Sequence, residues 1–131
     1  MKNLVITALS ILLFCSVAPA QTKIASKDAA KHIGDTVTIS DKIYSTKLIE
    51  NTNMILLDMG GSHPDQLLTI VIKGEDRSKF NNKPEEYYKG RNVRVTGIII
   101  NYNGNPEIIV SSPADLKVEL MDNIVPQRNS F

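Results

Sequence analysis

Asp58, His63 and Asp65 are the residues whose types and spacing come closest to a chemical site. They lie within eight positions of one another, and two carboxylates with one imidazole suit a hard or borderline divalent cation. Gly60 to Asp65, the stretch that follows Asp58 and contains the other two residues, is rich in Gly, Ser, Pro and Asp, as loops are. Such side chains also serve turn geometry and solubility. We therefore predict no metal and no cofactor.

Arrangements typical of catalysis do not occur elsewhere in the sequence. Cys15 is the only cysteine, and there is no nucleophile elbow, no phosphate-binding glycine loop and no paired-histidine motif. His32, beside a short apolar stripe, is interpreted as a surface or packing residue. Asp41 has no acid–base partner nearby in the sequence. The sequence therefore predicts a protein that is not an enzyme.

The first 20 residues have the pattern of a secretory signal peptide. A short basic start precedes an apolar run, Leu4 to Val17, and the small-residue cleavage pattern Ala18-Pro19-Ala20. A membrane helix and a lipid anchor are the alternatives, but the run is shorter than the roughly 20 residues of a span, and Phe14 before Cys15 does not suit lipoprotein processing. We predict export, to the periplasm or beyond, of a chain that starts near Gln21 and has no membrane span.

The remaining chain has the length of one domain. Removal of 20 of the 131 residues leaves 111, and we expect a domain over residues 21–120 and a flexible tail over residues 121–131. Of the 15 basic residues, Lys2 lies in the part removed, so 14 basic residues face 14 acidic ones. A neutral chain can carry a local basic patch, but tight polyanion binding usually goes with a basic excess.

The apolar pattern predicts mostly strands. A short helix is expected over residues 26–33, and two helical turns, near residues 76–80 and 84–90, connect the third strand to the fourth. The turn Asn103-Gly104 is typical of a tight hairpin between the fourth and fifth strands. The expected strands are Thr36 to Lys47, Met54 to Met59, Leu67 to Lys73 and the two halves of residues 90–111, with a further short strand at Leu116 to Leu120.

One spacing of residues occurs twice in the chain, 56 positions apart. Gly34, Val37, Ile39, Asp41 and Ile43 repeat the spacing of Gly90, Val93, Val95, Gly97 and Ile99. A strand that turns a corner of a closed sheet needs a bulge or a glycine where it bends. We therefore predict bends at Asp41 and Gly97, and pairing of these two strands to close a barrel.

The order of these elements resembles an OB-fold, a five-stranded all-β Greek-key barrel. The sequence is similar to small exported bacterial OB-fold proteins of uncharacterised role in IGDTVTISDKI, LLDMGG, LLTIVIKGEDRSKF and YYKGRNVRVTGIIINYNGNPEIIVSSPADL. A more distant similarity is to nucleic-acid-binding OB domains of the anticodon-binding type. The resemblance covers about residues 24 to 120, and its matching turn glycines and core residues say more about fold than about function.

The resemblance implies a ligand face made by the second and third strands and two loops. It implies single-stranded nucleic acid as the ligand, held by stacked aromatic side chains and a basic groove. This set is thin, because the chain has no tryptophan and is only 5% aromatic. Tyr87 and Tyr88 lie in the connector, where we expect them to pack. The residues expected to bind the ligand are Lys42, Tyr44, Lys47, Thr69, Val71, Lys73, Arg94 and Tyr102.

A second hypothesis is a protein-interaction or envelope structural module that uses an apolar face of the second and third strands. Leu67, Thr69 and Val71 alternate with the expected core residues of the third strand. A broad apolar patch near Leu67 and Val71 would favour a protein partner, whereas a contiguous patch of the four expected cations would favour nucleic acid. Oligosaccharide binding, a third hypothesis, would rest on Tyr44 and Tyr102 alone.

Overall fold

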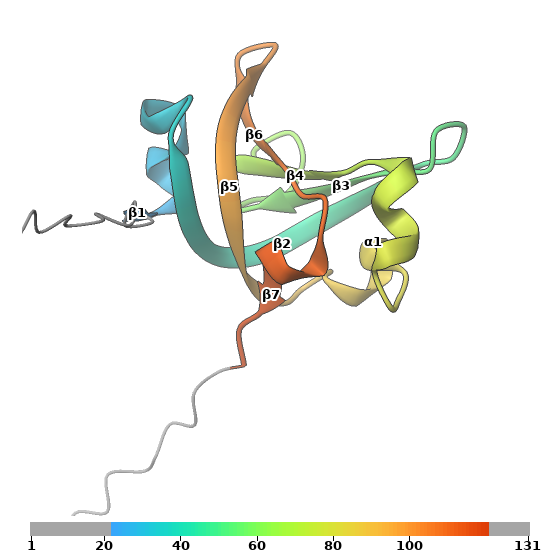
Figure 1. Cartoon of the computed structure of the whole chain (residues 1–131). Helices are drawn as coiled ribbons and strands as arrows, with labels where there is room; N and C mark the ends of the chain where they lie inside the picture. The colour runs from blue at the N-terminus through green and yellow to red at the C-terminus, as the bar shows by residue number, and fades with distance from the viewer. Residues whose placement is uncertain (1–21, 121–131) are drawn as a thin grey trace, which may run out of the picture.

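Two long strands, β2 (Thr36–Ile49) and β5 (Asn92–Tyr102), organise the computed structural model, which describes residues 22–120 (Figure 1). Each changes its antiparallel partner part-way along its length. β2 pairs with β5 as far as Lys42 and with β3 from Ile43, while β5 leaves β2 after Ile98 and pairs with β6 from Ile99. The predicted signal peptide, residues 1–20, and the predicted tail, residues 121–131, lie outside the described residues.

The pairings of five strands form a closed cycle that begins and ends at β2. β2 is antiparallel to β3 (Met54–Met59), and β3 to β4 (Leu68–Ile72). β4 runs parallel to β6 (Asn105–Ile109), which is antiparallel to β5. Because β5 is antiparallel to β2, five strands form a closed cycle, as the sequence predicts for its first and fourth strands.

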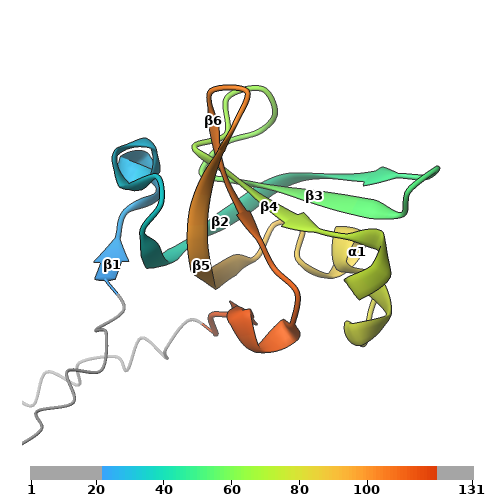
Figure 2. The ribbon, with the colours of Figure 1, turned by 45° about the horizontal axis from the view of Figure 1, so that its top comes forward.

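Two three-residue strands extend this sheet to seven. β1 (Thr22–Ile24) runs parallel to β2, and β7 (Leu116–Val118) is antiparallel to β5. The two flank the β2–β5 pair from opposite sides (Figure 2). β7 lies where the sequence predicts a short strand, but β1 is not predicted, because three residues with one apolar side chain carry no alternation signal.

The core lies inside the closed cycle. On every strand of the cycle, alternate residues point inward and are buried, as strand geometry requires. Full burial of such a side chain stabilises the fold by about 1.5 to 3 kcal/mol, and no cysteine lies within residues 22–120 to add a disulfide. The largest fully buried side chains are Ile39, Ile43, Ile55, Leu57, Met59, Leu68, Ile70, Ile72, Ile99, Ile108, Leu116 and Val37.

The helical segments are short. η1 (Ser26–His32) is a 3₁₀-helix, and Ser26 does not cap it: the Ser26 hydroxyl donates to the Asp41 carboxylate on β2. The connector between β4 and β5 holds a 3₁₀-helix, η2 (Gly74–Lys79), and one α-helical turn, α1 (Pro84–Tyr87). η3 (Pro113–Asp115) precedes β7. Within residues 22–120, no helix is long and apolar enough to span a membrane.

The structure differs from the sequence prediction at both expected bends, Asp41 and Gly97. Asp41 pairs in register with Val93, so the prediction of a bulge at Asp41 is wrong. The register of β2 shifts between Ile43 and Ser45 instead, which leaves Tyr44 as the extra residue of the bulge. Gly97 also pairs in register, but a Cβ atom there would lie 2.7 Å from Cγ2 of Ile108. Gly97 is therefore required for the close approach of β6 rather than for a bulge.

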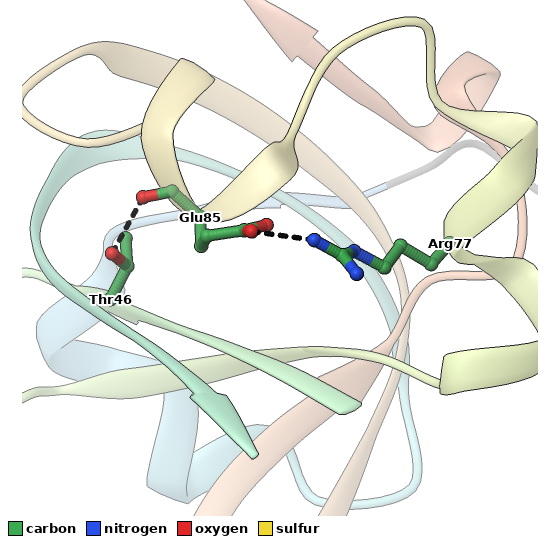
Figure 3. Close-up of polar contacts among 3 residues, drawn as sticks. All are labelled: Thr46, Arg77 and Glu85. Atoms are coloured by element: carbon green, nitrogen blue, oxygen red, sulfur yellow. Dashed lines mark hydrogen bonds and ion pairs between the residues drawn. The ribbon is translucent and has the colours of Figure 1, made fainter. Parts of the chain in front are cut away.

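The connector is fixed to the strands by polar and aromatic contacts. Arg77 forms an ion pair of 2.7 Å with Glu85, whose carbonyl oxygen accepts a 2.7 Å hydrogen bond from Thr46 Oγ1 of β2 (Figure 3). The Tyr88 ring packs edge-on against Phe80 and Tyr87 and belongs to the core. The predicted packing role of Tyr88 is confirmed.

Candidate nucleic-acid interface

The outward side of β3, β4 and β6 corresponds to the ligand face that the resemblance implies. One row of outward residues crosses this face from Lys47 on β2 through Leu56 and Val71 to Ile109. The next row contains Ser45, Asp58, Thr69, Glu107 and Ile100. We call this surface, with Tyr102 two residues further along β5, the apolar face.

The centre of the apolar face is closed by its own side chains. Val71 lies between Leu56 and Ile109 and is only 5% exposed. Thr69 is 4% exposed and accepts a hydrogen bond of 3.3 Å from Nε2 of Gln66. All five residues of β4 are buried. Ligand binding by Thr69 and Val71 stays a prediction, and little of either side chain is available to a ligand.

Accessible apolar groups lie at the margin of this face, on the β5–β6 hairpin. Ile98, Ile100 and Tyr102 share the outward side of β5, and all three are exposed, Tyr102 by 59%. Ile109 of β6 is exposed as well. Tyr102 is therefore the aromatic ring of this hairpin that is available for stacking.

Two carboxylates lie on the apolar face and oppose a polyanion there. The Asp58 carboxylate is buried and accepts a 2.7 Å hydrogen bond from the Ser45 hydroxyl. Burial raises the pKa of the Glu107 carboxyl above its usual range. Because both acids lie near the middle of the face, phosphate groups are expected to follow its edges, where Lys47 and Lys73 are exposed.

The loop between β3 and β4 adds a small pocket at the β2 edge of the apolar face. The pocket has a volume of about 320 Å³, and its lining includes Lys47, Leu56, Asp58 and His63. The His63 backbone N–H donates a 3.0 Å hydrogen bond to the Ser45 hydroxyl, which fixes the loop to β2. Within the described part of the chain, no three His, Asp or Glu side chains are grouped so that they could hold a metal ion.

Lys42 and Tyr44 form a separate pair at the bend of β2. The Lys42 ammonium lies 5.0 Å from the centre of the Tyr44 ring, a cation–π contact. Both side chains are exposed. Lys42 belongs to the part of β2 that pairs with β5, so this pair lies beyond the bulge that separates it from the apolar face.

Arg94 lies on a different surface from the other expected cations. It faces outward from β5, opposite Ser40 of β2 on one side and Lys117 of β7 on the other. Lys117 and Lys23 of β1 share this region with Arg94. Their position depends on strand pairings that no local pattern in the sequence reveals. The expected cations therefore form no single contiguous patch: Lys47 and Lys73 flank the apolar face, and Arg94 lies elsewhere.

Solved structures share this fold. Asparaginyl-tRNA synthetase from Entamoeba histolytica matches 86% of this chain with a TM-score of 0.53 and 22% identity, and the enzyme from Pyrococcus horikoshii matches 73% with a TM-score of 0.50 and 17% identity. RecG bound to a three-way DNA junction matches 78% with a TM-score of 0.51 and 20% identity. The matches cover 27%, 22% and 13% of those chains. No family model and no curated protein matches the sequence.

At these identities the likeness shows the fold alone. The described residues form an all-β, OB-fold-like domain, as the sequence resemblance implies, and this domain spans about a quarter or less of the proteins that it matches. Among these, two are tRNA synthetases and one is bound to DNA.

Proposed function

We propose that the chain is a non-enzymatic, exported module that binds single-stranded nucleic acid on the apolar face of a five-stranded OB barrel. The observation that carries the proposal is the exposed Tyr102, beside Ile100 on the same strand, in a fold shared with RecG bound to DNA and with two tRNA synthetases. Export is proposed from the signal-peptide pattern of residues 1–20, and the absence of catalysis from the sequence motifs.

In this proposal, aromatic stacking provides most of the affinity. A base stacks on Tyr102 and contacts Ile100, an interaction that contributes about 1 to 3 kcal/mol for each stacked base. Lys47 and Lys73 contact phosphates along the edges, away from Asp58 and Glu107. With two cations involved, the affinity is expected to be moderate and to fall with salt, because each neutralised phosphate releases counterions.

A second candidate function is docking of a protein partner. It is favoured by the exposed isoleucines Ile98 and Ile100, which lie on the same side of β5 as Tyr102, and by the exposed Ile109 of β6. Such a partner would cover the same hairpin as the nucleic acid. The two candidates differ in salt dependence, because burial of apolar area does not release counterions.

The test is a titration of the purified protein with fluorescently labelled single-stranded DNA and RNA, at low and at physiological salt. Tyr102→Ala is expected to weaken binding about tenfold or more, through the loss of stacking. Tyr102→Phe is the matched control, because it keeps the ring and removes only the hydroxyl, and its affinity should stay within about twofold of the unmodified protein.

Equal affinity of Tyr102→Ala and the unmodified protein would place the nucleic acid elsewhere on the domain. Absence of binding even at low salt would reject nucleic acid as the ligand. The exposed isoleucines would then be the remaining feature, and the protein-partner hypothesis would be tested with Ile100→Ser.

A further inference from the structure

A second hollow lies on the opposite part of the sheet from the apolar face. It has a volume of about 350 Å³ and lies against β1, β2, β5 and β7. This volume is at the lower end of the range of about 300 to 1,000 Å³ found for small-molecule sites. We call it the cationic pocket, and its lining residues are Lys23, Thr38, Arg94, Thr96, Ala114, Asp115 and Lys117.

The pairing of β5 with β7 and of β1 with β2 brings the cations of this pocket close together. Arg94 and Lys117 are directly opposite each other on β5 and β7, and Lys23 of β1 is opposite Thr38 of β2. Like charges directly opposite each other in a ladder are destabilising. The fold thus holds Arg94 and Lys117 together at a cost in stability, which a bound anion would offset.

The lining of the pocket carries more positive than negative side chains. Within residues 22–120, none of Lys23, Arg94 and Lys117 forms an ion pair. Asp115 is the one acidic residue in the lining, so the pocket has three positive charges against one negative charge. The neighbouring Glu119 accepts a hydrogen bond of 2.6 Å from the Ser40 hydroxyl.

The base of the pocket is polar. Thr38 is 5% exposed, and its hydroxyl lies 3.0 Å from the hydroxyl of Thr96 in the neighbouring strand. A guanidinium with planar donors beside two ammonium groups matches the oxygens of a phosphate group, which accept several charge-assisted hydrogen bonds. Apolar ligands are disfavoured because the lining offers little carbon surface other than Ala114.

From this arrangement we infer that the cationic pocket binds a phosphate group, as inorganic phosphate or as the phosphate of a small phosphomonoester. The inference does not rest on the proposed function, because the pocket and the apolar face lie on different parts of the sheet. Arg94 contacts the phosphate oxygens, and Lys23 and Lys117 neutralise its charge from the two edge strands.

The test is a titration of the ¹⁵N-labelled protein with inorganic phosphate at constant ionic strength, followed by amide chemical shifts. Saturable shifts are expected at Thr38, Arg94, Thr96 and Lys117. Arg94→Gln is expected to raise the Kd for phosphate at least tenfold, because the charge-assisted hydrogen bonds from the guanidinium to the phosphate oxygens are lost. Lys117→Gln, on an edge strand, is a second variant whose Kd should also rise.

Lys89→Gln is the charge-matched control. Lys89 is an exposed lysine of the connector and does not line the cationic pocket, so its removal should leave the Kd unchanged. Shifts that do not saturate, or a Kd that is unchanged in both Arg94→Gln and Lys117→Gln, would overturn the inference. The cations would then serve only to protect edge strands β1 and β7 from pairing with other chains.

A second arm separates the sources of the phosphate. Short single-stranded oligonucleotides with a 5′-phosphate and with a 5′-hydroxyl are compared at the pocket. A terminal phosphate should compete with inorganic phosphate for the pocket, and the 5′-hydroxyl form should not. Equal competition by both forms would show binding of internal backbone phosphates, and would overturn the inference of a separate phosphate-group site.

Discussion

The apolar face, mostly on β3, β4 and β6, and the cationic pocket both include residues of the long strands β2 and β5. They differ in how their outward side chains are paired and covered. On the apolar face, Val71 packs between its neighbours in the ladder, and the Asp58 carboxylate has a hydroxyl donor. In the cationic pocket, Arg94 and Lys117 are opposed and unpaired within residues 22–120.

Because of this difference, the residues that stabilise the fold and the residues expected to bind ligands are largely different. Side chains at the centre of the apolar face contribute mainly to folding, and recognition there is left to the exposed margin around Tyr102. The cations of the pocket contribute repulsion to the fold. The place that the resemblance implies for a ligand and the place where cations gather are therefore two different surfaces.

The largest expected effect is at Gly97, where β5 passes from one surface to the other. Gly97→Val would place side-chain atoms against Ile108, which a Cβ atom alone would approach to 2.7 Å. We expect a loss of about 3 kcal/mol in the free energy of unfolding, because overpacking of a core costs about 1 to 3 kcal/mol or more. Urea denaturation measures this change.

The clash itself can be isolated by a double-mutant cycle. In an Ile108→Ala background, which removes Cγ2, Gly97→Val should cost less than in the unmodified protein. An equal cost in both backgrounds would mean that the strand bend, and not the approach of β6, requires the glycine.

The ionisation of Tyr88 is expected to make the stability of the fold beside the cationic pocket depend on pH. Its hydroxyl donates a 3.3 Å hydrogen bond to the Leu116 carbonyl oxygen, which holds β7 beside the cationic pocket. Burial, with a smaller contribution from Tyr87, raises the pKa of Tyr88 from 10.0 to about 12. A raised pKa favours the neutral form in the folded state, so stability is full below pH 10 and is lost between pH 10 and 12, by about 2 kcal/mol.

Denaturation at several pH values measures this loss, and Tyr88→Phe should remove most of the pH dependence above pH 10. As the pH rises, the amide signal of Lys117 in β7 should change before the amide signals of β4 do. If the pH dependence is the same with Phe at position 88, another group causes it.

Val71→Ala tests whether the centre of the apolar face is part of the fold. We expect a loss of about 1.5 kcal/mol in the free energy of unfolding, because buried methyl groups are removed between Leu56 and Ile109. Affinity for single-stranded DNA should change by less than about twofold. A large loss of affinity without loss of stability would mean that Val71 contacts the ligand directly.

The smallest expected effect is a gain in stability. Arg94→Gln removes one of two opposed cations and should raise the free energy of unfolding at low salt by about 0.5 kcal/mol. The gain should shrink as salt screens the repulsion. Lys89→Gln is again the control, and a loss of stability in Arg94→Gln at low salt would contradict the repulsion between Arg94 and Lys117.

Much of the fold is predictable from sequence because alternation and turn residues act locally. The strand alternation of Val93, Val95 and Ile99 and the Asn103-Gly104 turn locate β5 and β6, and Pro84 marks the start of α1. The bulge at Tyr44 is not predictable in this way, because it depends on the register of β2 against β3, which the internal repeat does not encode.

The candidate site is less predictable than the fold. Tyr102 is exposed, and its position beside the Asn103-Gly104 turn can be read from the sequence. The burial of Val71 depends on side chains from β3 and β6, and the opposition of Arg94 and Lys117 depends on the pairing of β5 with β7. Such contacts join residues far apart in sequence, so a single sequence does not reveal them.

The most direct test of the account is to map single-stranded DNA onto the ¹⁵N-labelled protein by amide chemical shifts, at low salt. Binding on the apolar face should perturb amides along β3 and on the β5–β6 hairpin around Tyr102. The amides of Arg94 and Lys117 should be unchanged by an oligonucleotide that has a 5′-hydroxyl. Perturbations that concentrate at Arg94, Thr96 and Lys117, with the hairpin unchanged, would contradict binding on the apolar face and would make the cationic pocket the nucleic-acid interface.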